Sequence, residues 1–132
     1  MDTALRDHVR QRAGGRCEYC HVIPRIDTAP FCIDHIIAKK HHGTDAIENL
    51  ALACFWCNIF KSENLSGIDP LTGNIVQLFH PRQDLWAEHF SWQGPVLVGQ
   101  TESARATIDV LNINLNERVA VRESLLAEGI IC

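Results

Sequence analysis

A chain of 132 residues, 46% hydrophobic and 21% charged, has the length and composition of one ordinary globular domain, which excludes a disordered or fibrous protein. The formal net charge of −4 argues against a broad electrostatic attraction to nucleic acid. The charge is uneven, however: residues 1–62 carry eight Lys or Arg against seven Asp or Glu, and the remainder carries four against nine. Any contact with phosphate is therefore expected in the first half.

The sequence also carries signals about compartment. No apolar run approaches the length that crosses a membrane, and the N-terminal stretch does not have the pattern of a secretory signal. We expect a soluble, cytoplasmic protein with no membrane partner. In such a compartment, paired cysteines indicate a metal site more often than disulfides.

The first half is predicted to be a helix, a loop, a strand–turn–strand and a second helix. Apolar residues recur at helical spacing over 3–13, and two glycines follow. On that helix Arg6 and Arg10 share a face, which is either solvated or in contact with phosphate. The other predicted elements are a loop or irregular hairpin arm over 21–30, a strand over 31–37, a polar turn over 38–49, a return strand or extended arm over 50–54, and a helix starting within 54–64.

The second half, after Gly67, is predicted to be a small α+β extension that packs on the first half. The predicted elements are a turn and strand over 68–79, a turn and short helix over 80–92, a strand over 94–99, and helices over 101–113 and 116–129. Thr101 and Asn116 are candidate N-caps, and Gly129 should end the last helix. The aromatic residues predicted in the core are Phe79, Trp86, Phe90 and Trp92.

Four cysteines fall in two C-x-x-C pairs, Cys17 with Cys20 and Cys54 with Cys57. Two such turns can complete a tetrahedron of thiolates around Zn²⁺, and four thiolates leave no open position, so this zinc is expected to be structural. Redox thiols or buried free cysteines are the alternatives. The two remaining cysteines lack partners at ligand spacing: Cys32 is predicted to be a buried strand residue and Cys132 a terminal thiol.

A second pattern lies between and just after these pairs. Asp34 and His35 are adjacent, Asn49 follows fourteen residues after the histidine, Asn58 comes directly after the second C-x-x-C, and Lys61 follows it. Over residues 16–64 this pattern resembles the HNH endonuclease family, which includes colicin-type and homing nucleases. The combination resembles a small stand-alone bacterial HNH protein of the Cys₄ zinc type. Where many members carry a third histidine, this chain has Asn58, as does the nuclease domain of RNA-guided CRISPR effectors, so it is an HNN variant.

The resemblance implies a fold and a set of catalytic residues. The fold class is α+β, with a ββα-metal, treble-clef-like core, a structural zinc and a small α+β C-terminal extension. Residues 1–132 would form one HNH nuclease domain, with the motif core at 16–64 and the extension at 67–132. The catalytic set would be His35, Asn49 and Asn58.

Each residue of the motif has an expected role. A histidine titrates near neutrality, so His35 could deprotonate a water in line with phosphorus. Asp34 and Asn58 would supply oxygen ligands to one divalent cation, Mg²⁺ or another, although Asn58 could instead cap the second helix. Asn49 would bridge the turn backbone. Because adjacent strand residues point to opposite sides, the resemblance implies that the strand ends or twists so that Asp34 and His35 both reach the cleft.

The candidate contacts to nucleic acid are Arg16, Lys39, Lys40 and Lys61, each of which could instead be solvated. His41 and His42 join the polar cluster on the turn, where one could be a second metal ligand. His80, Arg82 and His89 could line the cleft.

These observations favour a metal-dependent endonuclease that hydrolyses DNA phosphodiester bonds. The alternative is a non-catalytic, zinc-stabilised nucleic-acid-binding module. RNA is not excluded as the substrate, since nothing in the sequence distinguishes the two sugars. A homodimer is possible because cutting two strands would usually need two active sites.

Overall fold

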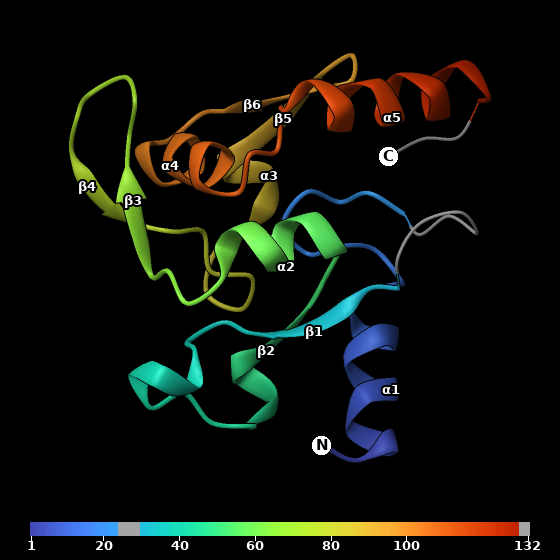
Figure 1. The fold of residues 1–132 in the computed structure, drawn as a ribbon, viewed down its shortest axis with the longest axis vertical. Coiled ribbons are helices and arrows are strands. Elements are labelled where there is room, and N and C mark those ends of the chain that lie inside the picture. The colour runs from blue at the N-terminus through green and yellow to red at the C-terminus, as the bar shows by residue number, and fades with distance from the viewer. Residues whose placement is uncertain (24–29, 130–132) are drawn as a thin grey trace.

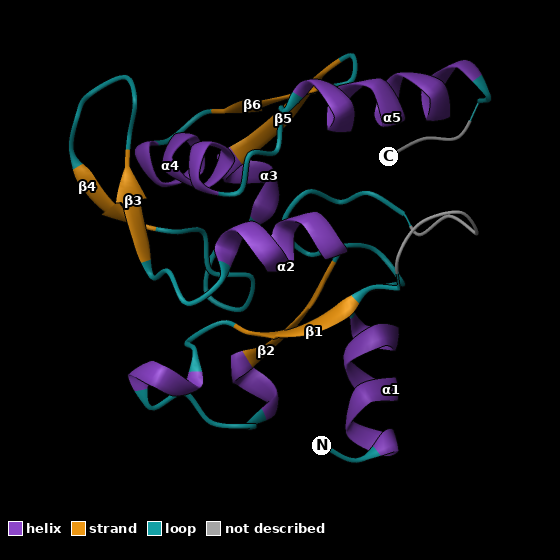
Figure 2. Ribbon diagram, viewed as in Figure 1, coloured by secondary structure: helices purple, strands orange, loops and turns teal. Residues whose placement is uncertain are grey.

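The computed structural model describes residues 1–23 and 30–129 of the chain (Figure 1). Helices and short strands alternate, and the described strands form three antiparallel two-stranded sheets (Figure 2). The predicted α+β class is therefore confirmed. Within the described residues, no helix has the length and apolar character needed to cross a membrane.

The elements of the first half appear in the predicted order. They are α1 (Thr3–Arg12), β1 (Cys32–His35), β2 (Leu50–Ala53) and α2 (Phe55–Lys61). Two 3₁₀ turns, Lys39–His41 and Ile47–Asn49, shape the polar connection between the strands. Part of the predicted loop over 21–30 lies outside the described residues.

The β1–β2 hairpin is packed on both faces, with α1 on one side and α2 on the other (Figure 1). Leu50 and Leu52 join a buried cluster with Val9 of α1, whereas Ala51 and Ala53 belong to the main core beside the cysteines. Side chains of a strand alternate between its faces, so the burial of all four β2 residues follows from this double cover.

The second half contains two hairpins where single strands were predicted. Its elements are β3 (Ser66–Ile68), β4 (Ile75–Gln77), α3 (Trp86–His89), β5 (Phe90–Gln93), β6 (Val96–Gly99), α4 (Glu102–Val110) and α5 (Asn116–Ala127). The strands β3 and β5 were missed because each is only three or four residues long and has no clear two-residue alternation.

The predicted helix ends were partly right. Thr101 caps α4, since its hydroxyl accepts a hydrogen bond from Ala104 N at 3.1 Å. The prediction for Asn116 is wrong: Asn116 is the first residue of α5, and Leu115 stands at the cap position without a side-chain hydrogen bond. Gly129 follows the last turn of α5 with φ +78°, a left-handed conformation that glycine adopts without strain.

The extension packs directly on the first C-x-x-C turn. Phe79 and Phe90 are buried in the main core as predicted, and Trp86 and Trp92 pack half-buried against it. The indole Nε1 of Trp86 donates to the carbonyl of Tyr19 at 2.8 Å. One continuous cluster of buried residues thus includes side chains from both halves of the chain.

Candidate active site and metal centre

The two C-x-x-C turns bring four buried thiols together. The Sγ atoms of Cys17, Cys20, Cys54 and Cys57 all lie within 4.8 Å of one another. The Cys20 and Cys54 sulfurs are 3.8 Å apart, which matches two corners of a tetrahedron with Zn–S bonds of about 2.3 Å. Within each turn the second cysteine's amide donates to the first sulfur, at 3.5 Å and 3.4 Å. These four cysteines are therefore positioned for a metal ion, and their donor set fits zinc.

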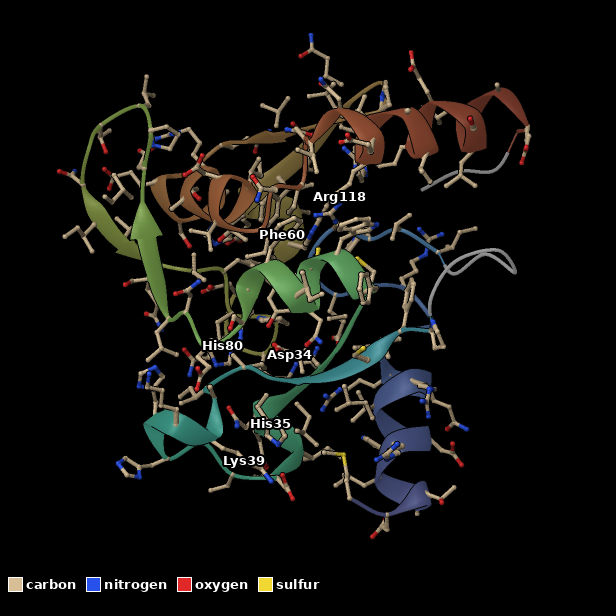
Figure 3. The ribbon with its side chains drawn as sticks, in the orientation of Figure 1. Asp34, His35, Lys39, Phe60, His80 and Arg118 are labelled. Carbon is tan, nitrogen blue, oxygen red and sulfur yellow. The ribbon has the colours of Figure 1, made fainter. Side chains whose placement is uncertain are left out.

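Arg118 of α5 contacts this cluster from the extension (Figure 3). Its guanidinium donates to Cys57 Sγ at 3.1 Å, to Cys54 Sγ at 3.7 Å and to the Leu111 carbonyl at 2.7 Å. Burial alone would lower the pKa of Arg118, but the charges of the neighbouring cysteines raise it above its usual value. Sequence reasoning missed Arg118 because it lies 61 residues after Cys57 on an ordinary amphipathic helix.

The other two cysteines differ from the prediction or lie outside the structure. Cys32 is partly exposed rather than buried, because it stands at the edge of the packed hairpin. Cys132 lies outside the described residues.

Asp34 faces α2 and is 5% exposed (Figure 3). Its Oδ2 accepts from the Tyr19 hydroxyl at 2.7 Å and lies 3.1 Å from the Lys61 ammonium, which is 3.4 Å from Oδ1. Burial raises the pKa of Asp34, and Lys61 and Tyr19 partly offset this. Burial also raises the pKa of Tyr19 well above its usual value, so the phenol keeps its proton and donates it.

Lys61 lies inside the protein rather than on a nucleic-acid surface. It is 2% exposed, and its Nζ also donates to the carbonyls of His35 and Ile36, each at 3.1 Å. This placement argues against the predicted contact with nucleic acid. The ammonium instead ties the end of α2 to the end of β1 and balances the charge of Asp34.

His35 lies on the opposite face of the hairpin from Asp34. Alternation continues to the last residue of β1, where His35 pairs with Leu50, a residue of the α1-side cluster, while Asp34 pairs with Ala51 of the main core. The expected twist that would bring both side chains into one cleft does not occur, because the regular register of the hairpin holds them apart.

The imidazole of His35 has a carboxylate partner that sequence reasoning did not single out. Its Nε2 lies 2.7 Å from Asp45 Oδ1, and Lys39 Nζ lies 3.7 Å from the same oxygen. The hydrogen bond with His35 lowers the pKa of Asp45. The available signal was weak: Asp45 is an acid in the polar turn that follows the strand carrying the histidine.

Asn49 braces that turn. Its Oδ1 accepts from Ile37 N at 2.8 Å, and its Nδ2 donates to the carbonyls of Ile37 at 3.0 Å and Thr44 at 2.8 Å. Gly43 is required beside it, because a Cβ there would lie 1.6 Å from the Ile37 carbonyl oxygen. Since Thr44 precedes Asp45, the amide of Asn49 fixes the carboxylate that contacts His35.

Asn58 lies inside α2, as its fourth residue. The alternative that it caps the helix is wrong, because Cys54 is the N-cap and accepts from Cys57 N. The Asn58 side chain is half-buried and has no hydrogen-bond partner within the described part of the chain. Its amide is therefore free to bind a ligand.

A pocket of about 440 Å³ opens beside His35, and we refer to it as the His35 pocket. Its lining includes Arg6, Arg10, His35, Lys39 and Asp45. The pocket thus brings the predicted contact residue Lys39 together with the predicted base.

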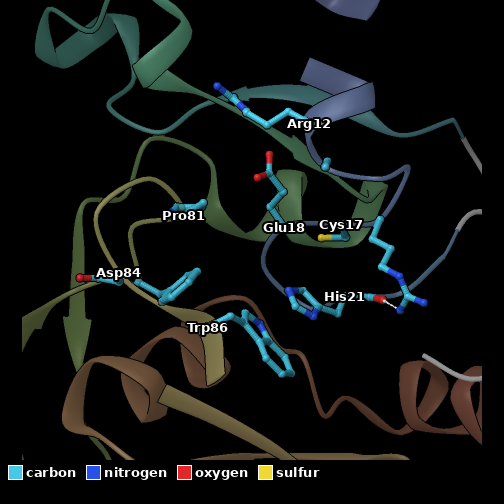
Figure 4. Close-up of a pocket in the computed structure, with 10 residues that line it drawn as sticks. Arg12, Cys17, Glu18, His21, Pro81, Asp84 and Trp86 are labelled. Carbon is cyan, nitrogen blue, oxygen red and sulfur yellow. Dashed lines mark hydrogen bonds between the residues drawn. The ribbon is translucent and has the colours of Figure 1, made fainter. Parts of the chain in front are cut away.

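The remaining candidate cations lie elsewhere. Lys40 is exposed on the turn and does not line the His35 pocket. Arg16 lines a separate pocket of about 230 Å³ beside the first C-x-x-C turn (Figure 4). In that pocket the ring of His21 stacks on Trp86 with centroids 3.8 Å apart, and Arg16 donates to the His21 carbonyl at 3.4 Å.

Of the three residues suggested for the cleft, His80 and His89 bond within the extension and Arg82 joins the extension to the first C-x-x-C turn. His80 Nδ1 accepts from the amides of Arg82 and Gln83, at 3.1 and 3.2 Å. The guanidinium of Arg82 pairs with Glu18. His89 Nδ1 lies 2.7 Å from the Thr101 hydroxyl. None of them lines the His35 pocket.

Comparison with known families assigns this segment. Residues 17–63 match the family model described as HNH endonuclease, from the first zinc-site cysteine to just beyond Lys61. The chain therefore carries a domain of the HNH endonuclease family, as the sequence pattern predicted. No curated protein and no solved structure matches the chain in the corresponding searches.

Proposed function

We propose that this chain is a metal-dependent endonuclease that hydrolyses DNA phosphodiester bonds with His35 as the general base. The observation that carries the proposal is the His35–Asp45 pair, 2.7 Å apart, at a pocket with three cationic side chains in its lining. A base oriented by a carboxylate and placed next to groups that attract phosphate is the arrangement hydrolysis requires.

In this proposal each nitrogen of His35 has a role. With Nε2–H donating to Asp45, Nδ1 is the unprotonated nitrogen and accepts a proton from a water molecule. Asp45 then stabilises the imidazolium that forms, and its own lowered pKa keeps it ionised for that purpose. Asn49 acts on the base through the backbone of the turn, not by touching the substrate.

The donor chemistry of Asp34 and Asn58 fits a hard divalent cation, since both offer oxygen and the Asn58 amide has no competing partner among the described residues. Mg²⁺ or a similar ion held by these residues would stabilise charge on the phosphate. Because Asp34 and His35 lie on opposite faces of the hairpin, the end of β1 must turn before one phosphate can contact both the cation and the base. Lys61 already neutralises Asp34 at 3.1 Å, so a cation there must compete with the ammonium. Dependence on the substrate's own phosphate oxygens is the expected consequence.

The occupied carboxylate favours a second candidate function, a non-catalytic nucleic-acid-binding module stabilised by zinc. Both oxygens of Asp34 lie within 3.4 Å of Lys61, and Tyr19 contacts one of them. In a binding module, this buried ion pair would hold α2 against β1, and no general base would be needed. Metal-dependent nicking by the parent protein separates the two candidates.

Three structural assignments belong to this proposal. We propose that β1, β2 and α2 form the ββα-metal core, that the zinc is structural, and that residues 1–132 act as one domain because a single buried cluster joins the motif to the extension. A homodimer would supply the second active site for cutting both strands.

The test is nicking of supercoiled plasmid by the full chain with Mg²⁺, Mn²⁺ or EDTA. We expect metal-dependent nicking by the parent, and a loss on the order of 10²–10⁴ in rate for His35→Ala, the usual contribution of a general base. The variant should retain its zinc and its melting temperature, because His35 lies outside the cysteine cluster. Nicking by His35→Ala at the parent rate would remove the proposed base, and binding without nicking by the parent would favour the binding module.

A further inference from the structure

The N-terminal helix lies outside the segment that matches the HNH family, yet it borders the predicted base. The match begins at residue 17, whereas α1 ends at Arg12. Arg6 and Arg10 of this helix line the His35 pocket together with Lys39. We infer that Arg6 and Arg10 bind backbone phosphates of a nucleic-acid strand that neighbour the phosphate attacked by the water that His35 activates, an inference that rests on the proposed function.

The position of α1 is fixed by contacts that do not involve these two arginines. Val9 is fully buried against Leu50 and Leu52 of β2. Arg12 donates to the carbonyls of Ile47 at 2.9 Å and Leu50 at 2.5 Å, which lie at the end of the turn that carries Asp45. One side of the helix is thus anchored to the active-site turn, and the pocket side is left to substrate.

Helical spacing and strand alternation place the two arginines beside the base. Residues four apart lie on the same face of a helix, so Arg6 and Arg10 form one cationic stripe. His35 emerges on the α1 face of the hairpin because it pairs with Leu50, the residue that contacts Val9. The pocket therefore has arginines on one side and the His35–Asp45 pair on the other.

The charge of the pocket fits a phosphodiester backbone. Its lining contains three cationic side chains and one acid, Asp45, although the whole chain is acidic. Within the described residues, Arg6 has no ion pair or side-chain hydrogen bond, and Arg10 has only a contact with Asp7 at 4.0 Å across an exposed surface, which contributes little. Both guanidiniums are free to make the paired hydrogen bonds that phosphate oxygens accept.

The experiment measures binding of a labelled DNA duplex by the full-length His35→Ala protein, alone and with Arg6→Gln, Arg10→Gln or both. Each phosphate contact contributes about 0.9 to the slope of log affinity against log salt on duplex DNA. We expect the slope to fall by about 0.9 for each single variant and by about 1.8 for the double variant. The control is Gln93→Glu, at an exposed position of β5 away from the pocket. It lowers the net charge by one unit, as each single Arg→Gln substitution does, and should leave the slope unchanged.

The second measurement is the steady-state kinetics of nicking by proteins that retain His35. The Arg6→Gln/Arg10→Gln protein should show KM raised on the order of tenfold, equivalent to about 1.4 kcal/mol, with kcat nearly unchanged. Retention of the parent salt slope and KM by the double variant would overturn the inference while leaving the nuclease intact. A parent that binds without cutting, with slopes that fall as stated, would reject the proposed nuclease and retain the phosphate-binding role. A parent that neither binds nor cuts rejects both.

Discussion

Asp45 lies between two cationic partners, His35 at 2.7 Å and Lys39 at 3.7 Å. Its side chain is 46% exposed, so solvent weakens both interactions and the carboxylate adds little to folding stability. Its contribution is orientational: Asp45 holds one imidazole nitrogen of His35 and leaves the other without this partner.

We predict that Asp45→Asn lowers kcat roughly 10- to 100-fold, by analogy with the loss of groups that orient metal-ligating histidines. KM and the salt dependence of binding should change little, because Asp45 does not bind phosphate. The measurement is steady-state nicking of the plasmid. Glu48→Gln removes an acid from the same turn that has no contact with His35, and it should nick at the parent rate. Equal losses in the two variants would show that net charge, not orientation of His35, is responsible.

At the scale of elements, the turn over 80–84 depends on one neutral imidazole. His80 is 9% exposed, and its Nδ1 accepts two backbone amides, so this nitrogen cannot carry a proton. Burial lowers the pKa of His80 from its ordinary value. The folded state therefore binds fewer protons at this site than the unfolded state does, at pH values between the folded and the unfolded pKa.

The sign of the pH effect follows from that difference. The unfolded imidazole titrates near pH 6.5, so the stabilisation is complete above this value and is lost as pH falls below it. We predict that His80→Asn, which keeps an acceptor near the Nδ1 position but does not titrate, makes the decline in free energy of unfolding between about pH 7 and 5 shallower. Urea denaturation at each pH measures this, with exposed His8→Asn as the control for losing an imidazole. An unchanged slope would show that protonation of His80 does not limit the turn.

Some elements and contacts could be predicted from the sequence, and others could not. Helix α1, the hairpin, α2 and the Thr101 cap were predictable because each depends on residues close together in the chain. The cysteine quartet was predictable because metal ligands have a characteristic spacing. The partners of the site residues were not predictable: Asp34 pairs with Lys61 across 27 residues, and nothing local indicates which of several lysines turns inward. Strand alternation correctly predicts that Asp34 and His35 lie on opposite faces of the hairpin, whereas the twist implied by the family resemblance does not occur.

At the scale of the whole molecule, Arg118 joins the extension to the cysteine cluster. Four thiolates around Zn²⁺ leave a net charge of about −2, and a buried guanidinium 3.1 Å from Cys57 Sγ compensates part of it. The extension therefore does more than cover the core, because it supplies a charge that the motif itself lacks.

We predict that Arg118→Met accelerates zinc transfer to a chromophoric chelator, with metal affinity lowered on the order of 10- to 100-fold, as for other groups that hydrogen-bond metal ligands. Arg118→Lys should restore part of the retention because it keeps the charge. Arg105→Met is the matched control, since it breaks the ion pair with Asp69, 2.9 Å apart, within the extension without touching a cysteine. If Arg105→Met releases zinc just as fast, loosening of the extension explains the effect and the contact with sulfur does not.

The distance along the chain between Cys57 and Arg118 has a consequence for biosynthesis. Ribosomes make proteins from the N-terminus, and segments that emerge early can fold before later ones exist. All four thiols are present once Cys57 has been made, 61 residues before the arginine that compensates part of their charge. A nascent chain can thus acquire its metal while the sulfurs are still open to solvent, and the extension closes over a centre that is already loaded.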